Sequence, residues 1–70
     1  SAGCTLNAAD EVAVEAFLAG EIPYPAIAAT VAATLERVGV SHPASIGELL
    51  AVDERSRAVA REQVKLLRRG

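Results

Sequence analysis

The sequence has few of the residues that cross-link small proteins or build metal sites. Among its 70 residues there is one cysteine, Cys4, and one histidine, His42. A single cysteine excludes an internal disulfide, and these two residues, far apart in the chain, match no metal-binding motif. Chains of this size often need a disulfide, a metal or a partner for stability. Contact with a larger structure is therefore the expected source of support.

Aromatic residues and methionine are equally scarce. The sequence has no tryptophan and no methionine, and Phe17 and Tyr24 are its only phenylalanine and tyrosine. The core must therefore consist of leucine, isoleucine, valine and alanine. Alanine has the highest helix propensity because it loses no side-chain entropy on ordering. This composition predicts closely packed helices.

Neither charge nor hydropathy indicates a nucleic-acid or membrane partner. The formal net charge is −2, which does not favour binding to a polyanion. No apolar run approaches the roughly 18–20 residues that span a bilayer. The start, Ser1-Ala2-Gly3, has no basic region, so we expect no signal peptide. Together with the lone thiol, this favours a cytoplasmic location.

Glycine, proline and capping residues divide the chain into a small all-α bundle of about four helices, three long and one short. No stretch alternates with the period of a strand. We expect helices at approximately residues 8–19, 25–38, 46–51 and 54–68. The expected N-terminal caps are Asn7, Asp53 and the capping box of Ser45 with Glu48, and the expected C-terminal stops are Gly20 and Gly39. Pro23 and Pro25 flank Tyr24 and predict a non-helical backbone for it.

Each expected helix has an apolar face at three- and four-residue spacing. These faces predict the core, and their members are Val14, Phe17 and Leu18; Ile27, Val31, Leu35 and Val38; Ile46, Leu49 and Leu50; and Ala58, Val59, Ala60, Val64, Leu66 and Leu67.

Three groups of residues are candidates for a metal-binding or catalytic site. Asp10, Glu11 and Glu15 could ligate a metal, but a hard cation needs more oxygen ligands than these. An acidic first helical turn with a solvated glutamate is the preferred interpretation. His42 stands in a loop without an acid or a nucleophile beside it, and we expect it to be exposed. Cys4 lacks a partner histidine, and we expect a small, partly buried thiol.

The last expected helix carries a basic stripe, formed by Arg57, Arg61, Lys65, Arg68 and Arg69. Such a stripe could bind phosphate, nucleic acid or an acidic partner. Glu62 interrupts it, and no aromatic residues are interleaved for base stacking, so a solvated helix face is the preferred interpretation. The sequence also lacks a glycine-rich phosphate loop, a Ser-His-Asp set and a Cys-x-x-Cys motif. We therefore expect no catalytic, cofactor-binding or metal-binding residue in this chain.

One segment resembles a known family. Residues 6–20 (LNAADEVAVEAFLAG) are similar to the L-N-A-A-N-E-x-A-x-x-A-F-L segment of the 1-deoxy-D-xylulose-5-phosphate reductoisomerases. Asp10 stands where that family commonly has asparagine. The similarity extends from Leu6 to about Leu67 through Ile22, residues 24–27, Leu35-Glu36, residues 46–53 and the helix that contains Arg57, Ala58, Ala60 and Val64.

The resemblance implies that residues 1–70 form a single helical domain, the non-catalytic C-terminal domain of a larger enzyme, and that it packs against the catalytic domain. The family uses NADPH and Mg²⁺, Mn²⁺ or Co²⁺ to convert 1-deoxy-D-xylulose 5-phosphate into 2-C-methyl-D-erythritol 4-phosphate in non-mevalonate isoprenoid biosynthesis. Its members are usually homodimers in the bacterial cytoplasm or the plastid. Their metal ligands, substrate-phosphate contacts and cofactor loop belong to the preceding domains, so the resemblance assigns no such residue here.

An alternative from another functional class is a free-standing helical protein-interaction module. Its basic last helix would then bind an acidic partner or nucleic acid, with an affinity that falls steeply as salt is added. Apolar docking onto a catalytic domain should be nearly insensitive to salt.

Overall fold

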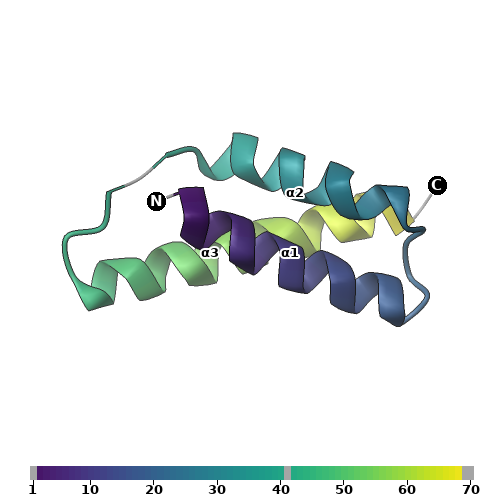
Figure 1. Ribbon diagram of the computed structural model, residues 1–70, viewed down its shortest axis with the longest axis horizontal. Helices are drawn as coiled ribbons and strands as arrows, with labels where there is room; N and C mark the ends of the chain where they lie inside the picture. The colour runs from purple at the N-terminus through teal and green to yellow at the C-terminus, as the bar shows by residue number, and fades with distance from the viewer. Residues whose placement is uncertain (1, 41, 69–70) are drawn as a thin grey trace.

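The computed structural model describes residues 2–40 and 42–68, and most of this part of the chain is helical (Figure 1). Within it, helix α1 spans Ala2–Leu18, α2 spans Pro25–Val38 and α3 spans Ile46–Arg68. Helix α2 runs antiparallel to the other two, and each helix contacts both of its neighbours. No strand occurs in the described residues, so the prediction of an all-α fold is confirmed.

The predicted division of residues 46–68 into two helices was wrong, because α3 is continuous. Asp53 does not cap a new helix; its Oδ2 atom accepts a hydrogen bond from Arg57 Nε, one turn further on, at 2.9 Å. Neither Val52 nor Asp53 is a glycine or proline, so nothing in the backbone requires a break. The described residues therefore hold three helices rather than about four.

Helix α1 begins earlier than predicted. Asn7, the expected cap, lies inside the helix, which already includes Gly3. Burial explains the longer helix, because Thr5 and Ala9 are fully buried against the rest of the chain. Tertiary packing of this kind outweighs the low helix propensity of one glycine. Asp10 consequently lies in the middle of α1 and not in its first turn.

Most of the other predicted helix ends are confirmed. Pro25 opens α2, and Gly39, with a φ of 75°, ends it. Gly20, with a φ of 78°, follows the end of α1; its N–H donates to the Phe17 carbonyl, and the Glu21 N–H donates to the Ala16 carbonyl. This pair of bonds is a Schellman motif, which satisfies carbonyls that the helix end leaves free.

Two further predictions concern the connecting segments. At the start of α3 the Glu48 N–H donates to Ser45 Oγ at 3.1 Å, and the Glu48 carboxylate accepts from the Ala44 N–H at 2.9 Å. The predicted capping box is thus present, with its return bond displaced by one residue. The non-helical backbone predicted for Tyr24 was wrong, because its φ of −51° and ψ of −47° are helical.

The core is made of small side chains. The largest fully buried residues are Thr5, Thr30, Thr34 and Ser56. The buried apolar cluster consists of Ala9, Val12, Ala16, Ile22, Ala26, Ala60 and Val64. Alanine and threonine let helix backbones approach closely, since interaxial distance depends on the side chains at the contact. The helices therefore pack tightly and leave little room between them for long side chains.

The predicted core was accordingly right only in part. Val59, Ala60 and Val64 are buried as expected. Leu18 and Ile46 are 77% and 76% exposed, and Leu49, Leu50, Ala58 and Leu66 are exposed as well. Val14, Phe17, Val38, Leu67 and the predicted α2 face of Ile27, Val31 and Leu35 are half-buried. Of these, Phe17, Ile27, Val31 and Leu67 pack against the edge of the buried cluster. The exposed side chains lie outside the three-helix contact.

Candidate interaction surface

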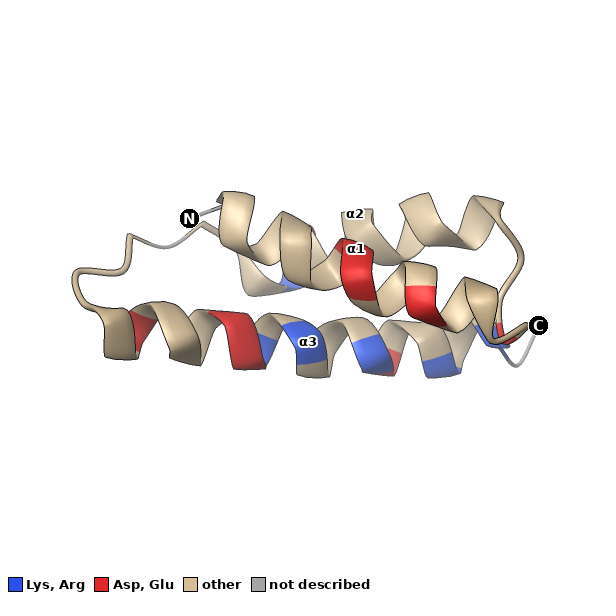
Figure 2. Ribbon diagram, turned by 60° about the horizontal axis from the view of Figure 1, so that its bottom comes forward, with Lys and Arg blue, Asp and Glu red and all other residues tan. Residues whose placement is uncertain are grey.

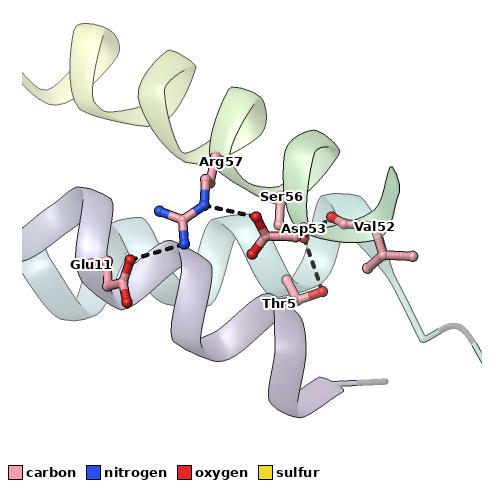
Figure 3. A network of polar contacts seen from close by, with 6 residues as sticks. All are labelled: Thr5, Glu11, Val52, Asp53, Ser56 and Arg57. Atoms are coloured by element: carbon pink, nitrogen blue, oxygen red, sulfur yellow. Dashed lines mark hydrogen bonds and ion pairs between the residues drawn. The ribbon is translucent and has the colours of Figure 1, made fainter. Parts of the chain in front are cut away.

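Arg57 is the best-connected charged residue of the described chain, and it joins α3 to α1 (Figure 3). Its Nε donates to Asp53 Oδ2 and its Nη2 donates to Glu11 Oε1, both at 2.9 Å. The hydrogen bonds that Arg57 donates to Asp53 and then to Glu11 raise its pKa above the usual range. One of the acidic candidates, Glu11, and one of the basic candidates, Arg57, are therefore engaged in holding α1 and α3 together.

The predicted basic stripe does not form a continuous positive surface. Arg68 pairs with Glu21 at 3.2 Å, and Arg37 of α2 pairs with Glu62 of α3 at 3.0 Å. Figure 2 shows acidic positions interspersed among the basic ones along α3, and acidic positions of α1 facing them. Arg69 lies outside the described residues. Because several arginines are paired with glutamates, the basic stripe has less free positive charge than the sequence suggested. This weakens the hypothesis of a nucleic-acid-binding module, which depended on that stripe.

Arg61, Lys65 and Arg68 line a shallow cleft between α1 and α3. Glu15 and Glu21 line the same cleft, whose volume is about 240 Å³. Charges of both signs at one open site give no net preference for an anion or a cation. The cleft is best explained as a solvated seam between the two helices.

The remaining sequence candidates do not converge. His42 is exposed and Cys4 is half-buried, as expected. Asp10, Glu11 and Glu15 lie on α1, but within residues 2–40 and 42–68 no three His, Cys, Asp or Glu side chains gather to hold a metal ion. No helix in the same residues is long and apolar enough to cross a membrane.

A buried polar contact, which the sequence analysis missed, joins the start of α1 to the middle of α3 (Figure 3). Ser56 Oγ lies 2.7 Å from the Val52 carbonyl oxygen and 3.1 Å from Thr5 Oγ1. The carbonyl can only accept, so the single Ser56 proton goes to it and Thr5 donates the second bond. The only sequence signal is a serine within an apolar helical stripe, and serine there is usually read as exposed.

An apolar hollow lies between α1 and α2, and we call it the α1/α2 groove. Its volume is about 540 Å³, and it is lined by Asp10, Val14, Tyr24, Pro25, Ile27, Ala28, Val31, Ala32 and Leu35. Ile27, Val31 and Leu35 are four residues apart and form one ridge of α2, the type of ridge that packs against another helix or apolar segment. Tyr24, 71% exposed, stands at one end and contacts Phe17 edge to face, with ring centroids 5.7 Å apart.

A second apolar surface lies at the start of α3. This helix has 23 residues, against 17 in α1 and 14 in α2. At 1.5 Å per residue it is about 34 Å long, so its first turns project beyond its partners (Figure 1). Ile46, Leu49 and Leu50 are exposed for this reason.

Comparison with known proteins identifies a family. The family model described as "DXP reductoisomerase C-terminal domain" matches residues 1–59. The chain is 53% identical over 62 residues to the 1-deoxy-D-xylulose 5-phosphate reductoisomerase of Solibacter usitatus, a match that covers 89% of this chain and 16% of that protein. It is 48% identical over 61 residues to the enzyme of the same name from Burkholderia multivorans, covering 87% of this chain and 15% of the relative.

The corresponding enzyme of Acidithiobacillus ferrooxidans is 43% identical over 60 residues, covering 86% of this chain and 15% of the relative. No solved structure matches the chain significantly. The matched segment spans about one sixth of the length of these curated relatives. Since the family model covers most of the sequence, the chain belongs to the DXP reductoisomerase C-terminal domain family.

Proposed function

We propose that residues 1–70 form one helical domain and serve as a non-catalytic structural part of an NADPH-dependent 1-deoxy-D-xylulose-5-phosphate reductoisomerase. The match of the family model to residues 1–59 carries this proposal. The 53% identity to a relative about six times longer supports it, because that relative contains a large additional polypeptide for this part to contact.

The activity belongs to the rest of that polypeptide in this proposal. The parent enzyme would use NADPH and Mg²⁺, Mn²⁺ or Co²⁺ to form 2-C-methyl-D-erythritol 4-phosphate in non-mevalonate isoprenoid biosynthesis. It would act as a homodimer in the cytoplasm. The helical part supplies no group to the reaction and supports the catalytic domain by packing an apolar face against it.

The distribution of apolar side chains supports a packing role. A chain of this size buries only about 60% of the surface that its unfolded form exposes. Here the three-helix core is built from alanine, threonine and a few larger residues, while Leu18, Tyr24 and Ile46 remain more than two-thirds exposed. Burying such side chains against a second domain contributes roughly 25 cal/mol for each Å² removed from water.

The test compares three forms of the Solibacter usitatus reductoisomerase: the whole enzyme, the enzyme without the segment that matches this chain, and a chimera in which residues 1–70 replace that segment. NADPH consumption with substrate is followed by absorbance, and folding by circular dichroism. We expect the truncated form to lose activity and the chimera to recover most of it. A folded truncated form that is as active as the whole enzyme would contradict a supporting role.

A further inference from the structure

The α1/α2 groove is the strongest candidate for the face that a partner covers. It joins half-buried, branched side chains of α2, Ile27, Val31 and Leu35, to Val14 of α1 in one continuous apolar hollow. On the surface of a soluble protein a continuous apolar patch usually marks an interaction site, whereas scattered exposed residues do not. The projecting first turns of α3 also carry exposed apolar side chains, but these come from one helix alone.

The shape of the groove favours a closely packed partner. Ala28 and Ala32 lie beside the ridge of Ile27 and Val31 and are exposed. Their short side chains leave space in which apolar groups from another segment can reach the α2 backbone. A partner with an apolar ridge would fill this space at the density of a protein interior.

The negative charge of Asp10 limits which kind of surface can cover the groove. Asp10 is the only charged residue that lines the groove, and it forms no ion pair with any residue in the described ranges 2–40 and 42–68. An apolar cover would remove water from its carboxylate, which is costly unless the partner donates a hydrogen bond or carries a positive charge. Beside the groove, Asp10, Glu11 and Glu15 line a second, acidic hollow with Leu18.

This acidic edge argues against a second copy of the chain. Two copies joined through this face would bring their carboxylates together, and like charges across an interface oppose association. The remaining polypeptide of the relatives is the more favourable occupant. It amounts to about five sixths of their length and is covalently joined to the helical part, which gives it a high effective concentration.

We propose that the α1/α2 groove is the face that packs against the rest of the reductoisomerase polypeptide, which presents an apolar ridge with a hydrogen-bond donor facing Asp10. This inference rests on the proposed function, because it takes the partner from that enzyme. It adds the location of the contact and the chemistry of the opposing surface.

The test measures solvent access in the chimera. With Cys4→Ser as background, Ala28→Cys places a thiol in the groove, and Ala58→Cys places one on α3 as a matched control, because both alanines are exposed helical positions. Alkylation of each site by N-ethylmaleimide is followed by mass spectrometry of its peptide, in the folded chimera and again in urea. We expect the groove thiol to react at least about tenfold more slowly than the control in the folded chimera, since it must wait for local opening. In urea the two rates should be similar.

Equal rates at the two sites in the folded protein, whether fast or slow, would overturn the assignment of the groove. Protection of the groove thiol that disappears on dilution would identify a second copy as the occupant and would also overturn it. If the chimera is insoluble, the same two cysteines are placed at the aligned positions of the Solibacter usitatus enzyme, where the same comparison applies.

Two variants at Asp10 test the opposing donor. Asp10→Asn retains an acceptor oxygen and should leave the protection of the groove thiol within about twofold. Asp10→Arg presents a donor to a donor and should reduce the protection several-fold. Equal protection in both variants would contradict the proposed donor.

NADPH consumption by the same preparations separates the groove hypothesis from the proposed function. An active chimera with an accessible groove thiol would refute the groove as the contact face and retain the proposed function. A folded but inactive chimera would refute the proposed function.

Discussion

Replacing Ser56 with alanine should destabilise the chain by more than an ordinary surface substitution would. Ser56 and Thr5 are both fully buried, and Ser56 is the only hydrogen-bond partner of the Thr5 hydroxyl among the described residues. The replacement removes the 2.7 Å bond to the Val52 carbonyl and leaves the Thr5 hydroxyl without a hydrogen-bond partner among residues 2–40 and 42–68. A buried donor left unsatisfied costs about 1–3 kcal/mol.

That loss is large for a protein of this size. A single core in a chain below about 70–80 residues rarely contributes more than about 3–5 kcal/mol. With a urea slope of about 1 kcal/mol per molar, a loss of about 2 kcal/mol lowers the unfolding midpoint by about 2 M. Urea titration followed by far-UV circular dichroism measures this shift directly.

A double-mutant cycle of Thr5→Val and Ser56→Ala tests whether the two hydroxyls are bonded to each other. Thr5→Val alone removes the donor but leaves Ser56 bonded to Val52, so it should cost about 1 kcal/mol. With both changes no orphaned hydroxyl remains, and the combined cost should fall short of the sum of the single costs by about 1 kcal/mol. Strictly additive costs, or a Ser56→Ala variant as stable as the wild type, would refute the pairing of these two hydroxyls.

The other predictions use the same urea titration. Gly20→Ala should destabilise the chain by about 1 kcal/mol because the Gly20 φ of 78° is unfavourable for alanine. Gly47→Ala should instead stabilise it by about 0.5–1 kcal/mol, since Gly47 lies inside α3 and the nearest atom to an added Cβ is 3.8 Å away. Equal effects of the two substitutions would contradict both predictions. Glu54→Pro should cost about 3 kcal/mol because α3 is continuous; unchanged stability would indicate a helix that starts at residue 54. The Thr30 hydroxyl is buried and has no hydrogen-bond partner in the described chain, so Thr30→Val should stabilise by about 1 kcal/mol. Thr34→Val is its control, because that hydroxyl donates to the Thr30 carbonyl at 2.7 Å and its loss should not stabilise; a gain only in the control would refute the argument.

The sequence alone was sufficient for features that depend on a few neighbouring residues. Pro25 and Gly39 mark the ends of α2, and Ser45 with Glu48 caps α3, because fixed φ angles, left-handed backbone and side-chain caps act within one or two turns. The all-α class followed from composition and periodicity. The family resemblance rested on residues 6–20, and the family match includes them.

Tertiary structure decided which residues are buried and where helices continue. Periodicity shows which side chains share a face, but α1 carries alanines on several faces, so it could not show that Ala9 and Ala16 would be inside while Leu18 would be exposed. Asp53 could equally have capped a new helix. Its role as a partner of Arg57 depends on α3 lying beside α1.

The side-chain contacts at the candidate surface could not be predicted from the sequence either, because they join residues that are far apart in the chain. Glu11 and Arg57 are 46 positions apart, and the hydroxyls of Thr5 and Ser56 are 51 positions apart, yet each pair meets between α1 and α3. No local signal in the chain specifies such a pairing. The sequence by itself therefore determined the helical class, several helix ends and the family, since these depend on local backbone preferences and residue identity. Only the packing of the three helices decided that mostly small residues fill the interior and that larger apolar ones line an open groove, because closely spaced backbones leave little space for long side chains between them.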